Sequence, residues 1–466
     1  MSALGRVTLV TRALRRYANV CASSSPRARL ATARVAAKPR ATSTARATSS
    51  RRMTTNAVAV DAQTTTEPRW DLEKHFGYAG TNDSAIDEAM SAVEKACEGF
   101  KATYEGTLDT SLLAAIETYE GIEQTLTTVL SYMSLSADTR LMDDAVQQRK
   151  GALMQQYGQA SGNYLTWFGL ELADMAESAL EAQYAKDAKL KNYKPYIDEV
   201  RRSAPYNLSK EVERALTVRS SFTGKGKVIE FYGNELSRLQ FDLDGKTVNM
   251  EVLLAKMTSS KDTMVRRQCM KTLNDGLKDF ERICALSLNM AAGSWAIENK
   301  ERGFKNLRSS RNLSNNLPDD VVDSLLAAVA TTGVDYCKKY YTLKKQILKS
   351  TQGLETFTWA DRNASIDIGS GEDNYSWEQA VDLVHKGYNK FSPTMADMFT
   401  KFVDEKRIDV PAQDGKRGGA YCSSAYGSGP FQLLNFTHSA RDVATLAHES
   451  GHAVHFELSY PQGILQ

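Results

Sequence analysis

The chain has 466 residues, 42% hydrophobic and 24% charged, which is typical of a folded globular protein and excludes a wholly disordered one. No run approaches the roughly 18 consecutive apolar residues of a membrane span, so we expect no membrane insertion. The net charge of +2 hides an asymmetry, because residues 1–60 contain eleven arginines and one lysine but no acid. The remaining residues, 46 basic and 56 acidic, carry a net charge of −10, which argues against nucleic acid as a partner.

Residues 1–60 have the composition of an organellar transit peptide. They are rich in Arg, Ser, Thr and Ala, and their first residues alternate arginine with apolar side chains. No clean apolar core follows the first basic residues, which disfavours a secretory signal. We therefore expect this segment to lack fixed structure and to direct the protein to an organellar matrix, that of the mitochondrion or the chloroplast stroma. A disordered basic tail is the alternative.

The first folded region, which we place at residues 68–200, has the apolar spacing of helices. Residues 84–104 repeat apolar side chains every three or four positions, which predicts an amphipathic helix. Residues 110–135 and 141–182 read as two long helices, and Thr139-Arg140 marks a short break between them.

A second helical region is predicted over residues 201–375, with one hairpin inside it. Ser209 has the side chain of an N-cap and is followed by acids, so we expect a helix over 209–221. Within residues 239–250, apolar and polar side chains alternate on both sides of Asp244-Gly245, a pair typical of a two-residue β-hairpin turn. Pro318 is expected at the first position of a later helix.

The last region, residues 376–466, mixes helices with short strands. A helical pattern is interrupted near Pro393, and a glycine-rich strand-and-turn segment follows at 415–421. Residues 431–435 then read as a second short strand. The sequence as a whole therefore predicts a mainly α protein with a small hairpin and a few short strands near its C-terminal helix.

That C-terminal helix carries His448-Glu449-Ser450-Gly451-His452. Histidines four apart project from one face of a helix, because one turn takes about 3.6 residues, so both imidazoles can bind one metal ion. Zn²⁺ accepts neutral imidazole nitrogen, and a catalytic site keeps one position open for water. Glu449, beside the first ligand, can take a proton from that water. The H-E-x-x-H spacing is the zinc metallopeptidase signature for this reason. Ser439 and Asp442 fit the serine-x-x-acid start of this helix, which its apolar flanks predict to be buried.

A third ligand is not found on the same helix. His455 lies seven residues after His448, and a rise of roughly 10 Å separates the two along the axis, whereas zinc–nitrogen bonds are about 2 Å. Glu457 points roughly 140° away from His452. A third ligand is therefore expected from a later helix.

Several segments together resemble the oligoendopeptidase F-type zinc peptidases, which are related to the thimet oligopeptidases. The resemblance extends from about residue 68 to the end, and it is strongest in four segments: Ile408-Asp409-Val410, Gly415 through Tyr421, Pro430 through Phe436, and Thr445 through His455. Trp70-Asp71-Leu72, Tyr132 through Leu135 and Asp138-Thr139 match more weakly.

The resemblance implies a large helical peptidase with two lobes around a deep channel that admits short unfolded peptides. It implies His448 and His452 as ligands of one Zn²⁺, Glu449 as general base, and a strand around Gly419, Ala420 and Tyr421 that binds substrate backbone. It also implies a third ligand, a glutamate about two dozen residues after the motif, which would lie beyond Gln466. Residues 376–466 are thus expected to form only part of the catalytic region, because in the family this region extends further along the chain.

Two function classes remain open from the sequence. The first is a zinc endopeptidase acting on short unfolded peptides, with Glu449 as base. The second is a non-catalytic, helical peptide-binding or interaction protein, since the third zinc ligand is missing. A zinc aminopeptidase is disfavoured because no acidic motif for an N-terminus is evident. The sequence leaves the oligomeric state open.

Overall fold

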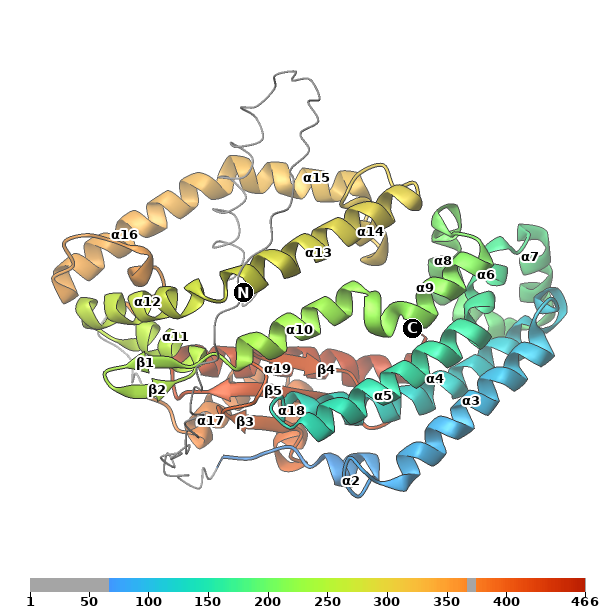
Figure 1. The fold of residues 1–466 in the computed structure, drawn as a ribbon, viewed down its shortest axis with the longest axis horizontal. Coiled ribbons are helices and arrows are strands. Elements are labelled where there is room, and N and C mark those ends of the chain that lie inside the picture. Colours follow the sequence, from blue (N-terminus) through green and yellow to red (C-terminus); the bar gives the residue numbers. More distant parts are fainter. Residues whose placement is uncertain (1–66, 367–373, 466) are drawn as a thin grey trace, which may run out of the picture. The chain divides into compact units, whose positions relative to one another are not determined.

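A computed structural model describes residues 67–366 and 374–465, and these residues are mainly helical, as predicted (Figure 1). Residues 1–60, the predicted transit peptide, lie outside the described residues. None of the described helices is long and apolar enough to cross a membrane. The helices up to residue 202 are α2 Leu72–Phe76, α3 Ser84–Tyr104, α4 Leu108–Asp138, α5 Asp144–Ala160, α6 Thr166–Asp174, α7 Glu177–Lys186 and α8 Lys194–Arg202.

The remaining helices fall before and after the undescribed residues 367–373. Before them lie α9 Lys210–Thr223, α10 Lys225–Ser237, α11 Met250–Ser259, α12 Thr263–Lys278, α13 Glu281–Glu301, α14 Ser309–Ser314, α15 Asp319–Ala328 and α16 Val334–Gln352. After them lie α17 Trp377–Phe391, α18 Pro393–Asp404 and α19 Ala440–Ser459. Shorter helical turns are η1 Ser161–Leu165, η2 Ala188–Tyr193, η3 Ala204–Tyr206, η4 Val329–Gly333, η5 Trp359–Asp361 and η6 Tyr460–Gln462.

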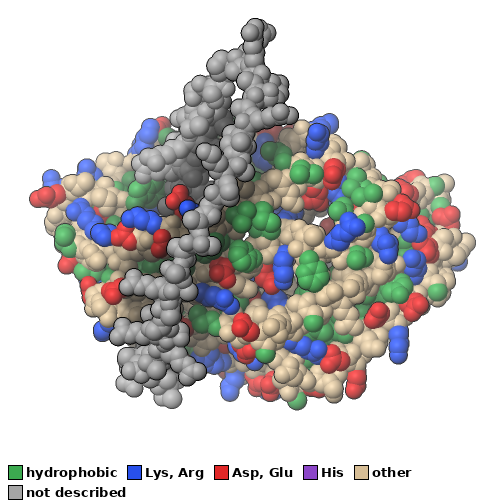
Figure 2. Space-filling model, viewed as in Figure 1, with side chains coloured by type: hydrophobic (Ala, Val, Ile, Leu, Met, Phe, Trp, Pro, Cys, Tyr) green, Lys and Arg blue, Asp and Glu red, His purple; other side chains and the backbone are tan. Residues whose placement is uncertain are grey.

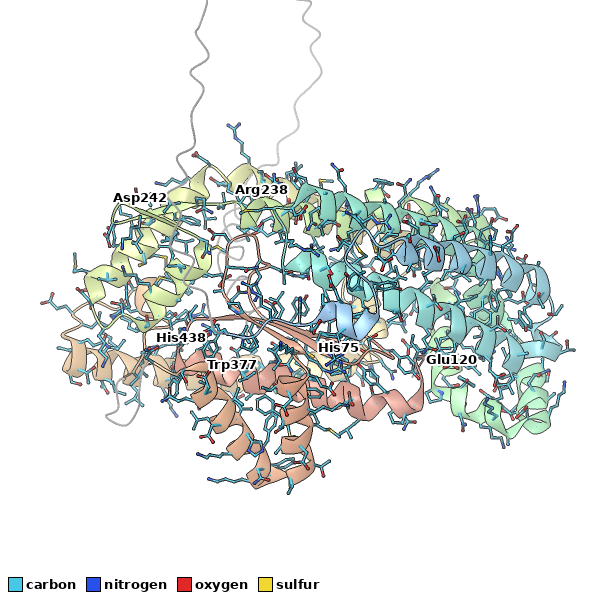
Figure 3. All side chains as sticks on the ribbon, turned by 90° about the horizontal axis from the view of Figure 1, so that it is seen from below. His75, Glu120, Arg238, Asp242, Trp377 and His438 are labelled. Atoms are coloured by element: carbon cyan, nitrogen blue, oxygen red, sulfur yellow. The ribbon has the colours of Figure 1, made fainter. Side chains whose placement is uncertain are left out.

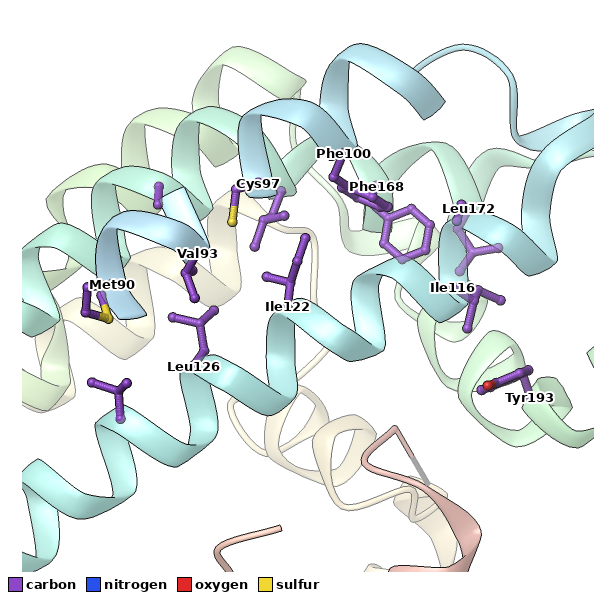
Figure 4. Close-up of a cluster of buried hydrophobic side chains, with 14 of the residues drawn as sticks. Met90, Val93, Cys97, Phe100, Ile116, Ile122, Leu126, Phe168, Leu172 and Tyr193 are labelled. Carbon is purple, nitrogen blue, oxygen red and sulfur yellow. The ribbon is translucent and has the colours of Figure 1, made fainter. Parts of the chain in front are cut away.

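The predicted helix over 141–182 is wrong in its continuity, because the structure divides it into α5, η1, α6 and α7. The π-helical turn η1 contains Gly162, at which a Cβ atom would lie 2.5 Å from Cγ2 of Val218 on α9. Only glycine permits so close an approach of two helices. The break at η1 therefore lies where α9, a helix distant in sequence, packs closely against the chain. Around it, side chains of α3, α4 and α6 form a shared core (Figure 4).

The predicted hairpin and the predicted Ser209 cap of the second region are confirmed. Ser209 caps α9 by accepting the Val212 amide, and β1 Phe241–Leu243 pairs antiparallel with β2 Lys246–Val248. Asp244 and Gly245 both have positive φ, 57° and 76°, as a two-residue turn of this hand requires. Pro318 differs slightly from expectation: it is the N-cap of α15 and precedes the first helical residue.

A three-stranded sheet supports the C-terminal helices. Its order is β3 Ile408–Pro411, β5 Phe431–Phe436 and β4 Tyr421–Ser423. β5 is parallel to β3 and antiparallel to β4. The α19 helix packs on β5 and β4, and α17 and α18 pack on α19 (Figure 1). Among the described strands, β4 is therefore an edge strand.

The first described residues join this sheet, far along the chain. The Pro68 carbonyl accepts the Val410 amide at 3.1 Å. On α2, His75 Nε2 lies 2.7 Å from the Glu405 carbonyl, and its ring meets Phe431 edge-on at 5.4 Å (Figure 3). The N-terminal and C-terminal parts of the folded chain therefore share a core.

Large apolar side chains remain exposed on the middle helices. Figure 2 shows hydrophobic side chains between charged ones on one face. On α13, α15 and α16, the exposed side chains include Leu286, Ile297, Leu325, Leu326 and Tyr336. The described residues leave these apolar side chains in contact with solvent.

One buried ion pair joins α12 to the segment after α16. Arg266 and Asp361 are both fully buried, and Arg266 donates to Asp361 Oδ1 from Nε at 3.0 Å and from Nη2 at 2.8 Å. Its other amino group donates to two backbone carbonyls and to Gln352. Removal of the carboxylate charge would leave this guanidinium buried without a counter-charge.

We expect Asp361→Asn to lower the free energy of unfolding by about 3–5 kcal/mol, because it leaves a buried charge unpaired. Asp275→Asn is the matched control, since Asp275 forms exposed ion pairs with Lys271 and Lys278 on the same helix. Exposed pairs contribute little, so this variant should unfold like the parent. Urea unfolding followed by circular dichroism measures both. Equal, small effects would contradict the assigned role of the buried pair.

Candidate metal centre and substrate strand

The site is carried by α19, which begins as the sequence predicted. Ser439 is its N-cap, and the Ser439 hydroxyl accepts the Asp442 amide at 3.3 Å while Asp442 accepts the Ser439 amide at 3.0 Å. Asp442 also accepts the amide and hydroxyl of Thr437, each at 2.9 Å. This capping box satisfies amides at the start of the helix and fixes its first turn.

The chain entering α19 is held by aromatic contacts. The Phe436 ring, at the end of β5, meets Trp377 edge-on at 5.8 Å and His438 at 5.2 Å (Figure 3). His438 has a φ of 65°, a left-handed conformation in which the chain turns from the strand towards the helix.

Burial along α19 follows the helical period. The buried residues lie three or four apart and form one stripe towards the sheet and α18: Leu446, Glu449, Ser450, Ala453 and Val454. His448 and His452 lie outside this stripe and are exposed. The expectation that the whole motif is buried is therefore wrong for the histidines and right for Glu449, which is 8% exposed.

The two histidines converge on one point. Nε2 of His448 and Nε2 of His452 are 3.3 Å apart, and the ring planes are nearly perpendicular at 87°. Two nitrogen ligands at about 2.0–2.1 Å from one tetrahedral Zn²⁺ are themselves about 3.3–3.4 Å apart. The imidazole pair therefore fits two adjacent ligands of one zinc ion.

No third ligand accompanies this pair within the described ranges, where three or more His, Cys, Asp or Glu side chains nowhere gather closely enough for a metal. His455, three residues after His452 on α19, is exposed, and its ring stacks on that of Phe456. Glu457 pairs with Lys401 of α18 at 2.7 Å. The sequence-based exclusion of Glu457 thus agrees with the structure.

Glu449 lies between the ligands in sequence and faces the sheet edge. Its carboxylate lies near the backbone N–H of Cys422, the central residue of β4. Burial raises the pKa of Glu449, and the adjacent His448 and His452 and the Cys422 amide oppose that rise. A carboxylate with a raised pKa is suited to accept a proton and to return it.

Neighbouring elements hold α19 in position. The Ser450 hydroxyl donates to Oε1 of Gln432 on β5 at 3.0 Å, and both residues are fully buried. On the other side, the Tyr388 hydroxyl of α17 donates to the carbonyl of Ala447, the residue before His448. Tyr388 also passes Gly451, where a Cβ atom would meet its hydroxyl at an ordinary 3.7 Å, so packing does not require this glycine.

The strand beside this helix is β4, which includes Tyr421, whereas Gly419 and Ala420 precede it and are not in a strand. Gly419 has a φ of 83°, and its carbonyl and that of Arg417 accept the Asn435 side-chain amide at 2.7 and 2.9 Å. Ala420 packs on the core around α17, and Tyr421 begins β4. Burial, together with the negative charge of Asp138, raises the pKa of the Tyr421 phenol, so this group stays protonated and donates a hydrogen bond.

Comparison with known proteins identifies the family. Residues 256–462 match the model of peptidase family M3, and residues 171–241 match the oligopeptidase F model. The chain belongs to peptidase family M3, and it is of the oligoendopeptidase F type.

Relatives of this M3 chain are similar over most of its length. Oligopeptidase PepF of Bacillus subtilis (strain 168) is 21% identical over 403 residues, covering 84% of this chain and 58% of that protein. Group B oligopeptidase PepB of Streptococcus agalactiae serotype III (strain NEM316) is 22% identical over 393 residues, covering 83% and 63%. The oligoendopeptidase-F structure from Enterococcus faecium superposes with a TM-score of 0.55 at 20% identity, covering 69% and 66%. The chain thus spans about three fifths of the length of these curated relatives.

Sequence reasoning missed the residues that position the site. Gln432, Tyr388 and Asp138 were not singled out as partners of the motif or of β4. Gln432 offered one signal, because a polar amide stands in an otherwise apolar strand pattern over 431–434. The contact of Tyr388 with α19 spans 59 residues, and no local pattern indicates it.

We expect His448→Ala and His452→Ala each to weaken Zn²⁺ binding more than about tenfold, because each removes one of two converging nitrogen ligands. His455→Ala is the control, since it removes an exposed histidine of the same helix that lies away from the pair. Isothermal titration of Zn²⁺ into metal-free protein measures all three. If His455→Ala weakened binding as much as the other two, the assigned ligands would be wrong.

Proposed function

We propose that this protein is a zinc-dependent endopeptidase that hydrolyses short, unfolded peptides. The observation that carries the proposal is the 3.3 Å separation of the His448 and His452 nitrogen atoms, with the Glu449 carboxylate beside them. Membership in family M3 and the similarity to oligopeptidases named PepF and PepB support peptides as the substrate class.

Each group of the site would have its own role in hydrolysis of the peptide bond. Zn²⁺ held by His448 and His452 would supply Lewis acidity, which polarises a carbonyl and lowers the pKa of a water molecule. Glu449 takes one proton from the attacking water as the water oxygen bonds to the scissile carbonyl carbon. Glu449 then returns this proton to the amide nitrogen as the carbon–nitrogen bond breaks, leaving a carboxylic acid and an amine. The acid then loses its proton to the amine, which gives a carboxylate and an ammonium group.

The outer edge of β4 provides a place for the substrate backbone. An extended peptide can add to a free strand edge by main-chain hydrogen bonds, whatever its side chains. The Cys422 amide faces this outer edge, because its partner Gln432 donates its own amide to the Arg407 carbonyl beside β3, so Cys422 and Gln432 exchange no main-chain hydrogen bonds. A peptide bound along β4 would therefore pass beside the base.

Glu449→Gln should reduce kcat at least about 10³-fold on a nine-residue quenched-fluorescence peptide, because the amide cannot accept the water proton. Its Zn²⁺ affinity should stay within about threefold of the parent, since Glu449 is not a ligand. A chelator should abolish cleavage by the parent protein, and added Zn²⁺ should restore it.

Each alternative predicts a different result for the same peptide. Peptide binding without cleavage, unchanged by chelator or by His448→Ala, would indicate a non-catalytic peptide-binding protein and overturn the proposal. Loss of cleavage on blocking the peptide N-terminus would indicate an aminopeptidase. Cleavage that persists in Glu449→Gln would exclude the assigned base.

We further propose an organellar location, on the basis of the acid-free, arginine-rich residues 1–60. A fluorescent protein fused after residue 60 should enter mitochondria or chloroplasts, and imaging with organelle markers distinguishes the two. Replacement of the four arginines in the first 16 residues by alanine should abolish import. Diffuse fluorescence from the unmodified fusion would refute the location.

A further inference from the structure

A buried carboxylate occupies an unfavourable position at the end of a long helix. Asp138 is the last residue of the 31-residue helix α4 and is only 6% exposed. A helix C-terminus carries partial negative charge, which disfavours an acid there, and the last turn of α4 contains no basic residue. Partners from outside the helix must therefore stabilise the charge.

Two of these partners come from the first residue of β4 and from the segment before it. Arg417 Nη1 and the Tyr421 hydroxyl both donate to Oδ2 of Asp138 at 2.9 Å. The Arg417 amide also donates to the Asp138 carbonyl at 2.7 Å, and its guanidinium lies 5.3 Å from the centre of the Tyr421 ring. The other carboxylate oxygen, Oδ1, faces Lys150 of α5 at 3.8 Å. Oδ2 of Asp138 therefore accepts hydrogen bonds from Arg417 and Tyr421, and Oδ1 faces a lysine of the neighbouring helix α5.

β4 is held from both faces. Successive residues of a strand point to opposite sides, so the Tyr421 side chain reaches α4 while the Cys422 side chain packs near Ala453 and Val454 of α19. The start of the strand also pairs with Leu433 of β5, and the Asn435 amide holds the segment before it. The hydrogen bond from Tyr421 to Asp138 fixes it against a helix that belongs to the N-terminal part of the fold.

We propose that Asp138 is a positioning residue for peptide binding, acting through Tyr421 and Arg417 to hold the outer edge of β4 beside Glu449. This inference rests on the proposed function, because it assumes that β4 pairs with substrate backbone. Of the three residues of β4, Cys422 turns its amide and carbonyl to the outer edge. Hydrogen bonds weaken steeply when their angle is poor, so a shift or rotation of β4 weakens both bonds that Cys422 can offer to a peptide. Asp138 touches neither substrate nor metal.

Tyr421→Phe tests this with the loss of one hydroxyl. On the nine-residue quenched peptide, it should raise KM about tenfold and leave kcat within about twofold, because substrate and transition state lose the same backbone pairing. Asp138→Asn should act in the same direction. Lys150→Ala is the matched control, since it removes a partner of the same carboxylate at the oxygen that does not serve β4, and its KM should stay within about twofold of the parent.

Binding of the same peptide, labelled with fluorescein, separates this inference from the proposed function. Fluorescence anisotropy in a Glu449→Gln background needs no turnover, and Tyr421→Phe should weaken the Kd about tenfold there too. If the parent protein binds the peptide but does not cleave it, only the proposed function fails. If Tyr421→Phe lowers the melting temperature but leaves KM and Kd unchanged, the hydroxyl is merely structural and the inference is overturned.

Discussion

Two imidazoles can share one ion only if their nitrogen atoms are held about 3.3 Å apart, and the pitch of α19 achieves this for residues one turn apart. The same pitch turns Glu449 and Ser450 towards the sheet and leaves His448 and His452 facing outwards. The proposed ligands and base are thus placed by a single helix, provided that the helix does not rotate about its axis.

That condition is met by contacts from three neighbouring elements. Gln432 of β5 holds Ser450, Tyr388 of α17 holds the carbonyl before His448, and the Cys422 amide of β4 meets Glu449. The last contact joins the base to the strand proposed to bind substrate. Because β4 is itself tied to α4 through Asp138, the N-terminal helices contribute to the geometry of a site whose motif lies more than 300 residues later.

Local features of the fold were predictable because each depends on a few adjacent residues. Ser209 and Ser439 were correctly predicted as caps, and Asp244-Gly245 as a turn, since one side chain or one backbone conformation decides them. The break at η1 was missed because it accompanies the approach of α9 to Gly162. Exposure of the two histidines was also missed, since apolar flanks indicate that a helix packs but not which neighbours cover each side.

In the candidate site, too, local features could be predicted from the sequence and contacts between distant segments could not. The H-E-x-x-H spacing was sufficient to select the candidate ligand pair and the candidate base, because helical geometry converts spacing into direction. The partners Gln432 and Asp138 depend on pairing between strands and helices distant in sequence, which no local pattern contains. The edge position of β4 likewise depends on the sheet order β3-β5-β4.

X-ray absorption at the zinc edge, on protein loaded with one equivalent of Zn²⁺, tests the central claim most directly. The account predicts scattering from two imidazole rings with zinc–nitrogen distances of about 2.0–2.1 Å. A spectrum without imidazole scattering, or one dominated by sulfur at about 2.3 Å, would show that the ion is held elsewhere and would contradict it.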